Sequence, residues 1–162
     1  MREDKKAEFE KIYLDYRENI FRVCLLMLKD SRLSEDAAQE TFYKALCNYG
    51  RFKANSSAKT WLTRIAINVC KDRLKKKSSH ETPQEDVDIL SYSENIDTRL
   101  TVTEAINSLP IELREVVVLY YYQQLTHKEI SGILGISVPN VAYRLRSAKE
   151  KLKTYLTEDN DD

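Results

Sequence analysis

The sequence predicts an all-α protein with two small helical domains: a three-helix bundle and a domain with a helix-turn-helix, joined by an acidic, flexible linker. The 162 residues contain only three glycines and three prolines, so few residues interrupt regular helices. Apolar residues recur three or four positions apart through most of the chain, which is the spacing of one helix face. Serine and threonine residues stand just before several of these stretches, as N-terminal helix caps do.

The first domain, residues 1–77, is predicted to hold three helices. A broad apolar stripe predicts the first helix over about residues 6–29. Ser34 is expected to cap the second helix, which would run to Tyr49, because acidic residues that favour a helix N-terminus follow this serine. The third helix is expected after a polar loop and would cover residues 58–77.

The second domain is predicted to begin with two helices that lie before the helix-turn-helix. Thr101 and Glu104 have the spacing of a capping box, so we expect a short helix to start there. Pro110 suits the first turn of the next helix, where its missing N–H has no helical partner. Val117 and Tyr121 lie on the face of this helix that we expect to pack against the helix-turn-helix.

The strongest local pattern lies in residues 125–152. Thr126 and Glu129 form a capping box that predicts a helix beginning at His127. Gly135 can take the left-handed conformation that ends this helix. Ser137 would then cap a second helix with a basic outer face. Two short helices with a glycine turn between them are typical of a DNA-binding helix-turn-helix. The alternative is an ordinary helical hairpin whose charged face is merely solvated.

Charge is distributed unevenly along a chain whose net charge is zero. Residues 59–77 carry seven basic and one acidic side chain, residues 78–104 carry one basic and seven acidic, and residues 127–156 carry six basic and two acidic. Two basic segments separated by an acidic one suggest two phosphate-contacting sites and a connection that avoids nucleic acid. We therefore divide the chain into a first domain, a linker, a second domain and an acidic tail, at residues 1–77, 78–98, 99–156 and 157–162.

The basic third helix of the first domain has a second possible role besides packing. It follows a loop with an aromatic residue, and such a combination can bind single-stranded nucleic acid, because bases stack on rings while cations follow the phosphates. The alternative is that Trp61 is a core residue and the lysines around it are solvated.

Residue patterns for metal, redox or enzymatic chemistry are not found. Cys24, Cys47 and Cys70 are far apart and lie in helical patterns, so we interpret them as reduced, core-type cysteines of a cytoplasmic protein. No Cys/His ligand spacing, catalytic triad or glycine-rich phosphate loop is present. We expect no metal, no cofactor and no enzyme activity. We also expect no secretory signal and no membrane insertion, because the longest apolar run, Val23–Leu28, is far too short to cross a bilayer.

Four motifs in order together resemble the bacterial extracytoplasmic-function (ECF) sigma factors, which contain only the second and fourth sigma domains. The resemblance covers nearly the whole chain, and it comes from four segments: the acidic helix Asp36–Phe42 (DAAQETF), Trp61–Asn68 (WLTRIAIN) followed by Asp72 and Arg73, Leu109–Val116 (LPIELREV), and Leu125–Ser137.

This resemblance implies partners for the first domain. The second helix, whose polar face is otherwise interpreted as solvated, would dock on the largest subunit of core RNA polymerase through Asp36, Gln39, Glu40 and Phe42. The third helix and the loop before it would open promoter DNA and hold the −10 element as a single strand. The residues implied in that contact are Arg51, Phe52, Asn55, Ser56, Trp61, Arg64, Asn68, Lys71 and Lys75.

The resemblance also implies that the helix-turn-helix reads the duplex −35 element in the major groove. The residues expected at that interface are Ser137, Pro139, Asn140, Ala142, Tyr143, Arg144, Arg146 and Lys149. Where the family often has Gly-Thr-Val at the start of this helix, the chain has Pro139-Asn140-Val141, so the −35 base sequence does not follow from the resemblance. An anti-sigma factor, the usual regulator in the family, is expected as a further partner.

The competing interpretation is a free-standing helix-turn-helix repressor or activator with a helical partner-sensing domain. Such a protein would bind specific duplex DNA tightly by itself. A sigma factor would select promoters only together with the polymerase. Dependence on polymerase therefore separates the two functions.

Overall fold

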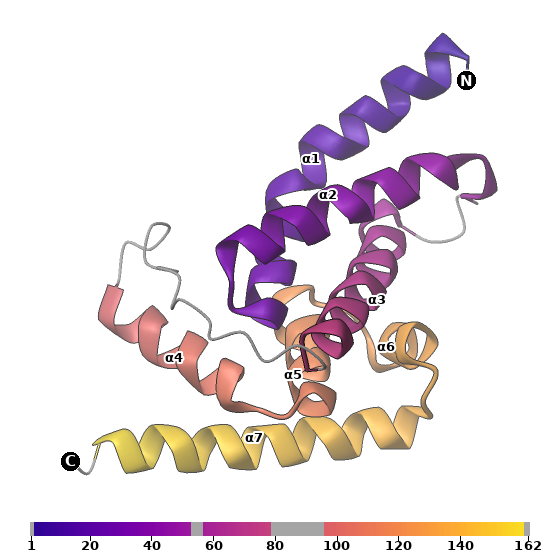
Figure 1. Cartoon of the computed structure of the whole chain (residues 1–162). Coiled ribbons are helices and arrows are strands. Elements are labelled where there is room, and N and C mark those ends of the chain that lie inside the picture. Colours follow the sequence, from indigo (N-terminus) through magenta and orange to yellow (C-terminus); the bar gives the residue numbers. More distant parts are fainter. Residues whose placement is uncertain (1, 53–56, 79–95, 161–162) are drawn as a thin grey trace. The chain divides into compact units, whose positions relative to one another are not determined.

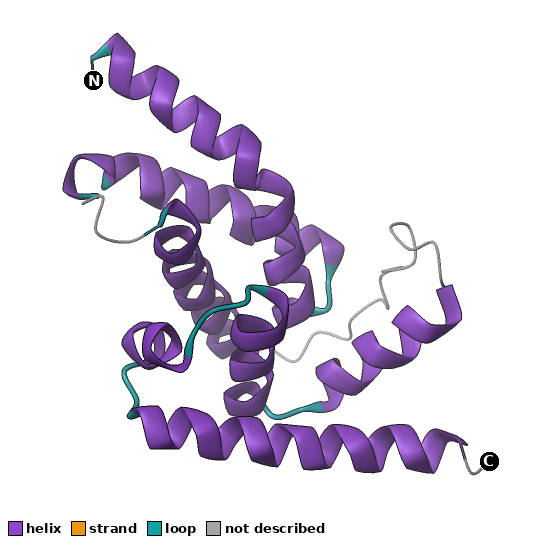
Figure 2. Cartoon of the chain, turned by 180° about the vertical axis from the view of Figure 1, so that it is seen from behind, coloured by secondary structure: helices purple, strands orange, loops and turns teal. Residues whose placement is uncertain are grey.

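The computed structural model describes residues 2–52, 57–78 and 96–160. The chain forms two compact units, Met1–Asp86 and Val87–Asp162. All regular secondary structure in the described residues is helical, as predicted (Figure 2). None of the described helices is both long and apolar enough to cross a membrane. Most of the predicted linker, residues 78–98, lies outside the described residues.

Unit 1 is the predicted three-helix bundle. Its helices are α1 (Glu3–Leu28), α2 (Ser31–Cys47) and α3 (Ala58–Ser78), and a short 3₁₀ turn, η1 (Tyr49–Arg51), follows α2 (Figure 1). Each of the three long helices packs against the other two. Their apolar faces enclose a core that contains Ile20, Val23, Met27, Ala37, Leu62 and Ile67.

The predicted start of α2 is wrong by four residues. Asp30, not Ser34, is the N-cap, and its carboxylate accepts two backbone N–H groups at 2.9 and 3.1 Å. Ser34 instead lies inside the helix, is buried, and donates its hydroxyl to the carbonyl of Asp30 at 2.6 Å. Lys29 takes a left-handed conformation (φ 68°) that ends α1, which leaves Asp30 as the next residue able to cap α2.

Helix α3 begins where predicted and ends one residue later, at Ser78, but it buries a slightly different face. The helical spacing predicts an inner stripe of Trp61, Leu62, Ile65, Ala66, Val69, Cys70 and Leu74. Thr63 and Ile67 are fully buried as well, although neither belongs to that stripe. The hydroxyl of Thr63 donates to the carbonyl of Lys59 at 2.6 Å, so a buried threonine is satisfied within the helix. The burial of Thr63 and Ile67 orients the helix so that Arg64 and Asn68, the residues that follow them, lie on its exposed face.

Unit 2 contains α4 (Ile96–Ser108), α5 (Ile111–Val117), the π-helical segment η3 (Val118–Tyr122), α6 (His127–Leu134) and α7 (Val138–Asn160). The predicted capping box at Thr101 is wrong, because α4 begins at Ile96 and Thr101 lies inside it. Pro110 does open α5, as expected. Helix α7 continues to Asn160, so most of the predicted acidic tail, residues 157–162, is helical.

The wide turn η3 changes which side chains after α5 are buried. The backbone N–H of Gln123 donates to the carbonyl of Val118 at 3.0 Å, five residues away, which is the bond of a π-helix. The turn shifts the helical phase, and Val116–Leu119 are four successive buried residues. Tyr121 is 56% exposed, so the prediction that it packs on the helix-turn-helix is wrong.

Candidate nucleic-acid interface

The helix-turn-helix has the local geometry that the sequence predicts. Thr126 and Glu129 form both hydrogen bonds of the capping box at the start of α6. Gly135 ends α6 with φ 68°, a left-handed conformation that glycine adopts without strain. The Oγ of Ser137 accepts the backbone N–H of Asn140 at 3.2 Å, which caps α7. The buried side chains Ile130, Ile133, Val141, Leu145 and Ala148 hold the two helices in place.

Most of the predicted −35 contacts lie on an exposed face of α7. Tyr143 is 64% exposed, and Ser137, Pro139, Arg146 and Lys149 are exposed too. Asn140 and Ala142 are half-buried and lie at the edge of this face. We call the exposed side chains Ser137, Pro139, Tyr143, Arg146 and Lys149, with Asn140 and Ala142, the α7 face.

Arg144 is placed differently from the other predicted contacts. Its side chain is only 22% exposed, and its Nη1 lies 3.5 Å from Oε1 of Glu115, a carboxylate of α5 that is 3% exposed. Its Nε donates to Oδ1 of Asn140 at 3.3 Å. The guanidinium therefore joins α7 to α5 and does not extend freely into solvent. Spacing alone could not predict this, because Glu115 lies 29 residues earlier in the chain.

A second arginine fixes the corner between α4 and α5. Arg114 donates from Nη2 to the carbonyl oxygens of Asn107 (3.1 Å) and Leu109 (3.0 Å). These carbonyls lie at the C-terminal end of α4, where backbone C=O groups have no N–H partner within the helix. Burial lowers the pKa of Arg114 from its ordinary value. Sequence reasoning assigned Arg114 to a family motif, and the structure gives it a local role at this corner.

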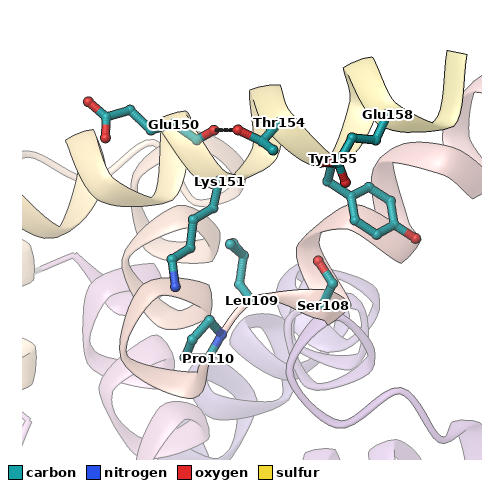
Figure 3. Close-up of a pocket in the computed structure, with 8 residues that line it drawn as sticks. All are labelled: Ser108, Leu109, Pro110, Glu150, Lys151, Thr154, Tyr155 and Glu158. Atoms are coloured by element: carbon teal, nitrogen blue, oxygen red, sulfur yellow. Dashed lines mark hydrogen bonds between the residues drawn. The ribbon is translucent and has the colours of Figure 1, made fainter. Parts of the chain in front are cut away.

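The same corner forms one side of a shallow groove of about 540 Å³. Ser108, Leu109 and Pro110 line this side, and the C-terminal half of α7 lines the other; the α7 residues are Glu150, Lys151, Thr154, Tyr155 and Glu158 (Figure 3). The ammonium of Lys151 extends toward Pro110, and Thr154 donates to the carbonyl of Glu150 at 3.0 Å. None of the predicted contact residues that the structure describes lines this groove.

The predicted −10 contacts in unit 1 divide into an exposed basic group and a partly buried aromatic group. Arg51, Arg64, Asn68 and Lys75 are exposed, and Lys71 is half-buried. Phe52 and Trp61 are half-buried. Asn55 and Ser56 lie outside the described residues. We call Arg64, Asn68, Lys71 and Lys75 the α3 face.

The aromatic group is a cluster that joins α1, η1 and α3. The ring centroids of Phe52 and Trp61 are 4.7 Å apart, and Tyr49 stacks on Phe52 at 6.1 Å. The edge of Phe9 meets Tyr49 at 5.4 Å, and the hydroxyl of Tyr49 donates to Oε2 of Glu8 at 3.2 Å. Loss of hydration and this bond to Glu8 raise the pKa of Tyr49. Trp61 is therefore a packing residue on one side and partly accessible on the other.

On α2, three of the four predicted docking residues lie at the surface. Asp36 and Gln39 are exposed, and the side chain of Glu40 is 37% exposed. Phe42 is instead a core residue, 6% exposed, and its ring packs edge-to-face with that of Tyr13, with centroids 5.0 Å apart. The structure therefore removes Phe42 from the docking surface and makes it part of the support beneath that surface.

Glu40 also holds α2 and α3 together. Its Oε2 accepts from Nη2 of Arg73 at 2.9 Å, and its Oε1 lies 3.4 Å from Nζ of Lys44. Burial of Glu40 opposes ionisation, but the hydrogen bonds and charges of Arg73 and Lys44 outweigh it and lower the pKa of this carboxyl below 4.5. The sequence alone contained no signal for the pair with Arg73, which is 33 residues away.

This ion pair gives a pH-dependent prediction. Because the folded pKa is lowered, the stabilisation by Glu40 should be present above about pH 4.5 and be lost as the pH falls through the lower folded value. We expect Glu40→Gln to reduce the urea midpoint of unit 1 modestly at pH 7, since the side chain is partly exposed. The difference in urea midpoint from the wild type should shrink as the pH falls below about 4.5. A difference that stays constant with pH would contradict the assignment.

The three cysteines do not share one environment. Cys24 and Cys70 are buried, as predicted, whereas Cys47 is exposed, so its interpretation as a core cysteine is wrong. A hydrogen bond with Cys24 and burial together raise the pKa of the Cys70 thiol. Among the described residues, no group of three or more His, Cys, Asp or Glu side chains is arranged to hold a metal ion.

Two protein families match the chain, one in each unit. The family described as Sigma-70 region 2 matches residues 12–80, which span the three-helix bundle. The family described as Sigma-70, region 4 matches residues 99–152, which contain the helix-turn-helix. The α3 face and the α7 face therefore lie in segments that match two different sigma regions.

Curated relatives and solved structures agree with these matches. The ECF RNA polymerase sigma factor SigM of Bacillus subtilis is 31% identical over 151 residues, which cover 89% of this chain and 92% of the relative. SigW of the same species, also an ECF RNA polymerase sigma factor, is 32% identical over 158 residues, covering 87% and 84%.

Among solved structures, the sigma factor RpoE from Bartonella quintana, in complex with the anti-sigma factor NepR, has the same fold with a TM-score of 0.79 at 18% identity, covering 93% of this chain and 97% of that one. CnrH, in complex with the cytosolic domain of CnrY, superimposes with a TM-score of 0.74 at 21% identity, covering 95% and 90%. The chain therefore belongs to the ECF sigma factors, the subunits that direct RNA polymerase to promoters and start transcription there.

Proposed function

We propose that the two units of this sigma factor divide its work, so that unit 1 holds the polymerase and the opened −10 strand and unit 2 reads the −35 duplex. The observation that carries the proposal is the placement of one exposed basic face on each unit. The α3 face presents Arg64 and Lys75, and the α7 face presents Arg146 and Lys149. Each face lies on a helix that a buried core supports from behind, which suits contact with a phosphate backbone.

Core RNA polymerase docks on α2 in this proposal. Asp36 and Gln39 are exposed on that helix, and Glu40 is partly exposed beside them. Phe42 packs below them against α1 and keeps the surface rigid. An acidic, rigid surface suits a partner that presents basic side chains.

The −10 element would lie along the α3 face as a single strand. Lys71 and Lys75 would follow the phosphates, and Asn68 would contact a base that has left the stack. Trp61 and Phe52 would offer ring surface at the N-terminal end of this path, with Arg51 near them in the sequence. Asn55 and Ser56 lie outside the described residues and stay predicted contacts. Unstacking a base costs a few kcal/mol, which these contacts and the polymerase would offset.

In the −35 contact, α7 would enter the major groove. Arg146 and Lys149 lie one turn apart on the exposed side of α7. Arg146 would bind a base edge or a phosphate there, and Lys149 would bind a phosphate. Ser137 and Pro139 are exposed at the N-terminal end of α7, where the backbone N–H groups favour a phosphate. Tyr143 and Ala142 would present apolar surface to the groove.

Regulation by an anti-sigma factor is part of the proposal. The solved structure of RpoE holds an anti-sigma factor, and CnrH is bound to the cytosolic domain of CnrY. We propose that a protein of this kind binds the chain in the cytoplasm and competes with core polymerase. The chain itself would act by binding and not by catalysing a reaction.

The experiment that tests the proposal uses purified chain, bacterial core polymerase and a labelled promoter library in a native gel. Selection of promoters only in the presence of core polymerase is expected, and sequencing of the shifted DNA would give both promoter elements. Selection of duplex sites by the chain alone, without association with the polymerase, would instead support a free-standing repressor or activator.

Asn68 allows a sharper test of the −10 assignment. Replacing Asn68 by Ala should slow promoter opening by about tenfold, because a hydrogen-bonded base contact worth ~1–3 kcal/mol exists only in the opened strand. Closed-complex binding should change much less. Permanganate reactivity of unpaired thymines measures opening, and Glu10→Ala, which changes an exposed residue on α1, is the control. Equal reactivity of the Asn68 variant and the wild type would rule out the assignment.

A further inference from the structure

Three polar side chains connect the interior of unit 2 to the α7 face. Glu115 of α5 is 3% exposed and lies 3.5 Å from Nη1 of Arg144. Nε of Arg144 in turn donates to Oδ1 of Asn140 at 3.3 Å. Asn140 is the outermost of the three, at the edge of the α7 face and in the first turn of the helix. A buried carboxylate is therefore linked, through one guanidinium, to a side chain that can meet DNA.

The link limits what Arg144 can do in a DNA groove. A guanidinium reads guanine with two parallel N–H donors, from either its end edge (Nη1 and Nη2) or its side edge (Nε and Nη2). Here Nη1 faces Glu115 and Nε faces Asn140, so each edge already has one donor in use. Leaving this position would also leave the charge of Glu115 without Arg144 in a buried site, which is costly. Arg144 is therefore held as a positioning residue.

The same link fixes the amide of Asn140. Its Oδ1 is turned toward Arg144, so its Nδ2 points away from the guanidinium and presents N–H donors. Reading adenine with both amide atoms needs the oxygen and the nitrogen to face one base edge together. With Oδ1 turned along the helix, Asn140 can instead donate to an acceptor such as guanine O6 or N7, thymine O4 or adenine N7. Cytosine presents a donor at N4 in the major groove and would be disfavoured.

We propose that Glu115 sets a base preference of the −35 contact without touching DNA, by holding Arg144 so that Asn140 offers donors only. This inference rests on the proposed entry of α7 into the major groove. It assigns the base preference to Asn140, the orientation of its amide to Arg144, and the restraint of Arg144 to Glu115.

The first test is Asn140→Asp, assayed as holoenzyme with core polymerase on a library randomised over the −35 element. Aspartate can still accept from Arg144, but it offers DNA an acceptor in place of a donor. The preferred base at one position should therefore switch to cytosine, whose N4 can donate, with a change in base ratio of about fivefold or more. A change of this kind requires a reversed hydrogen-bond direction, which loss of stability would not produce.

The second test separates Glu115 from a purely structural role. Glu115→Gln keeps the shape of the side chain but removes its charge, which weakens its hold on Arg144 because an amide oxygen is a weaker acceptor than a carboxylate. The amide of Asn140 can then turn more freely. Base preference at the same position should weaken by about threefold or more, while thermal unfolding confirms that unit 2 is folded. Glu112→Gln is the matched control, because Glu112 is an exposed acid on the same helix and should leave the preference unchanged.

The outcomes distinguish this inference from the proposed function. Lys149→Ala should weaken binding to all −35 sequences alike, as loss of a phosphate contact does. If the wild-type holoenzyme showed no base preference at the −35 element, the proposed entry of α7 into DNA would be wrong. A wild-type preference that remains identical in Glu115→Gln would leave that entry intact and overturn the inference about Glu115. A preference that remains identical in Asn140→Asp would overturn the assignment of this base contact to Asn140.

Discussion

Reversing the charge of Glu40, in the variant Glu40→Lys, is expected to abolish binding to core RNA polymerase. The carboxylate lies beside Asp36 and Gln39 on the proposed docking surface of α2. Loss of a charged contact within an interface commonly costs about 2–5 kcal/mol, and a reversed charge adds repulsion. The affinity should therefore fall by at least about thirtyfold. Titration of fluorescently labelled sigma factor with core polymerase measures this directly.

Glu40→Lys also breaks an internal ion pair, because Glu40 contacts Arg73 at 2.9 Å. A control variant must therefore separate the loss of this ion pair from the loss of polymerase docking. The variant Arg73→Gln breaks the same pair from the other side and leaves Glu40 in place. We expect this control to lower the stability of unit 1 slightly and to keep most of the affinity for core polymerase. If Arg73→Gln lost affinity as severely as Glu40→Lys, or if Glu40→Lys bound normally, the docking assignment would be wrong.

Truncating Ile130 to alanine is expected to destabilise unit 2 by about 2–5 kcal/mol. Ile130 is fully buried on α6, and its loss would leave a cavity between the helices of the helix-turn-helix. Small domains have a free energy of unfolding of only about 5–15 kcal/mol, so this change removes a large part of the stability of unit 2. Promoter binding that depends on the −35 element should fall sharply. Affinity for core polymerase should persist, because the docking surface belongs to unit 1.

The control for this variant is Val102→Ala in α4, where the side chain is 43% exposed and a truncation should cost little. Urea unfolding followed by circular dichroism measures both variants, and binding to promoters with altered −35 sequences measures recognition. Retention of the −35 preference in a destabilised Ile130→Ala protein would show that α6 and α7 do not act together as the reading element.

Local physics explains which elements the sequence predicted well. The capping box of Thr126 and Glu129 and the left-handed turn at Gly135 depend on residues within a few positions of each other. Such signals need no knowledge of the rest of the fold, so the limits of α6 and the start of α7 are confirmed. The same holds for α3, which begins directly after Ser57, whose Oγ accepts the backbone N–H of Thr60 at 3.1 Å.

The errors arise where two local signals compete or where a distant residue decides. Asp30 and Ser34 were both able to cap α2, and the end of α1 at Lys29 favoured Asp30. Tyr121 became exposed because it lies within the π turn Val118–Tyr122, which shifts the helical phase. Phe42 became a core residue because α1 offered Tyr13 as a packing partner.

The sequence by itself determined the helical class, the two units and the helix-turn-helix, because helical periodicity and N-terminal caps are encoded over a few neighbouring positions. Only the tertiary structure decided which charged side chains are available for binding. Glu40 meets Arg73 across 33 residues, and Arg144 meets Glu115 across 29. An ionised side chain that loses water needs an opposite charge nearby, and folding alone brings such partners within reach.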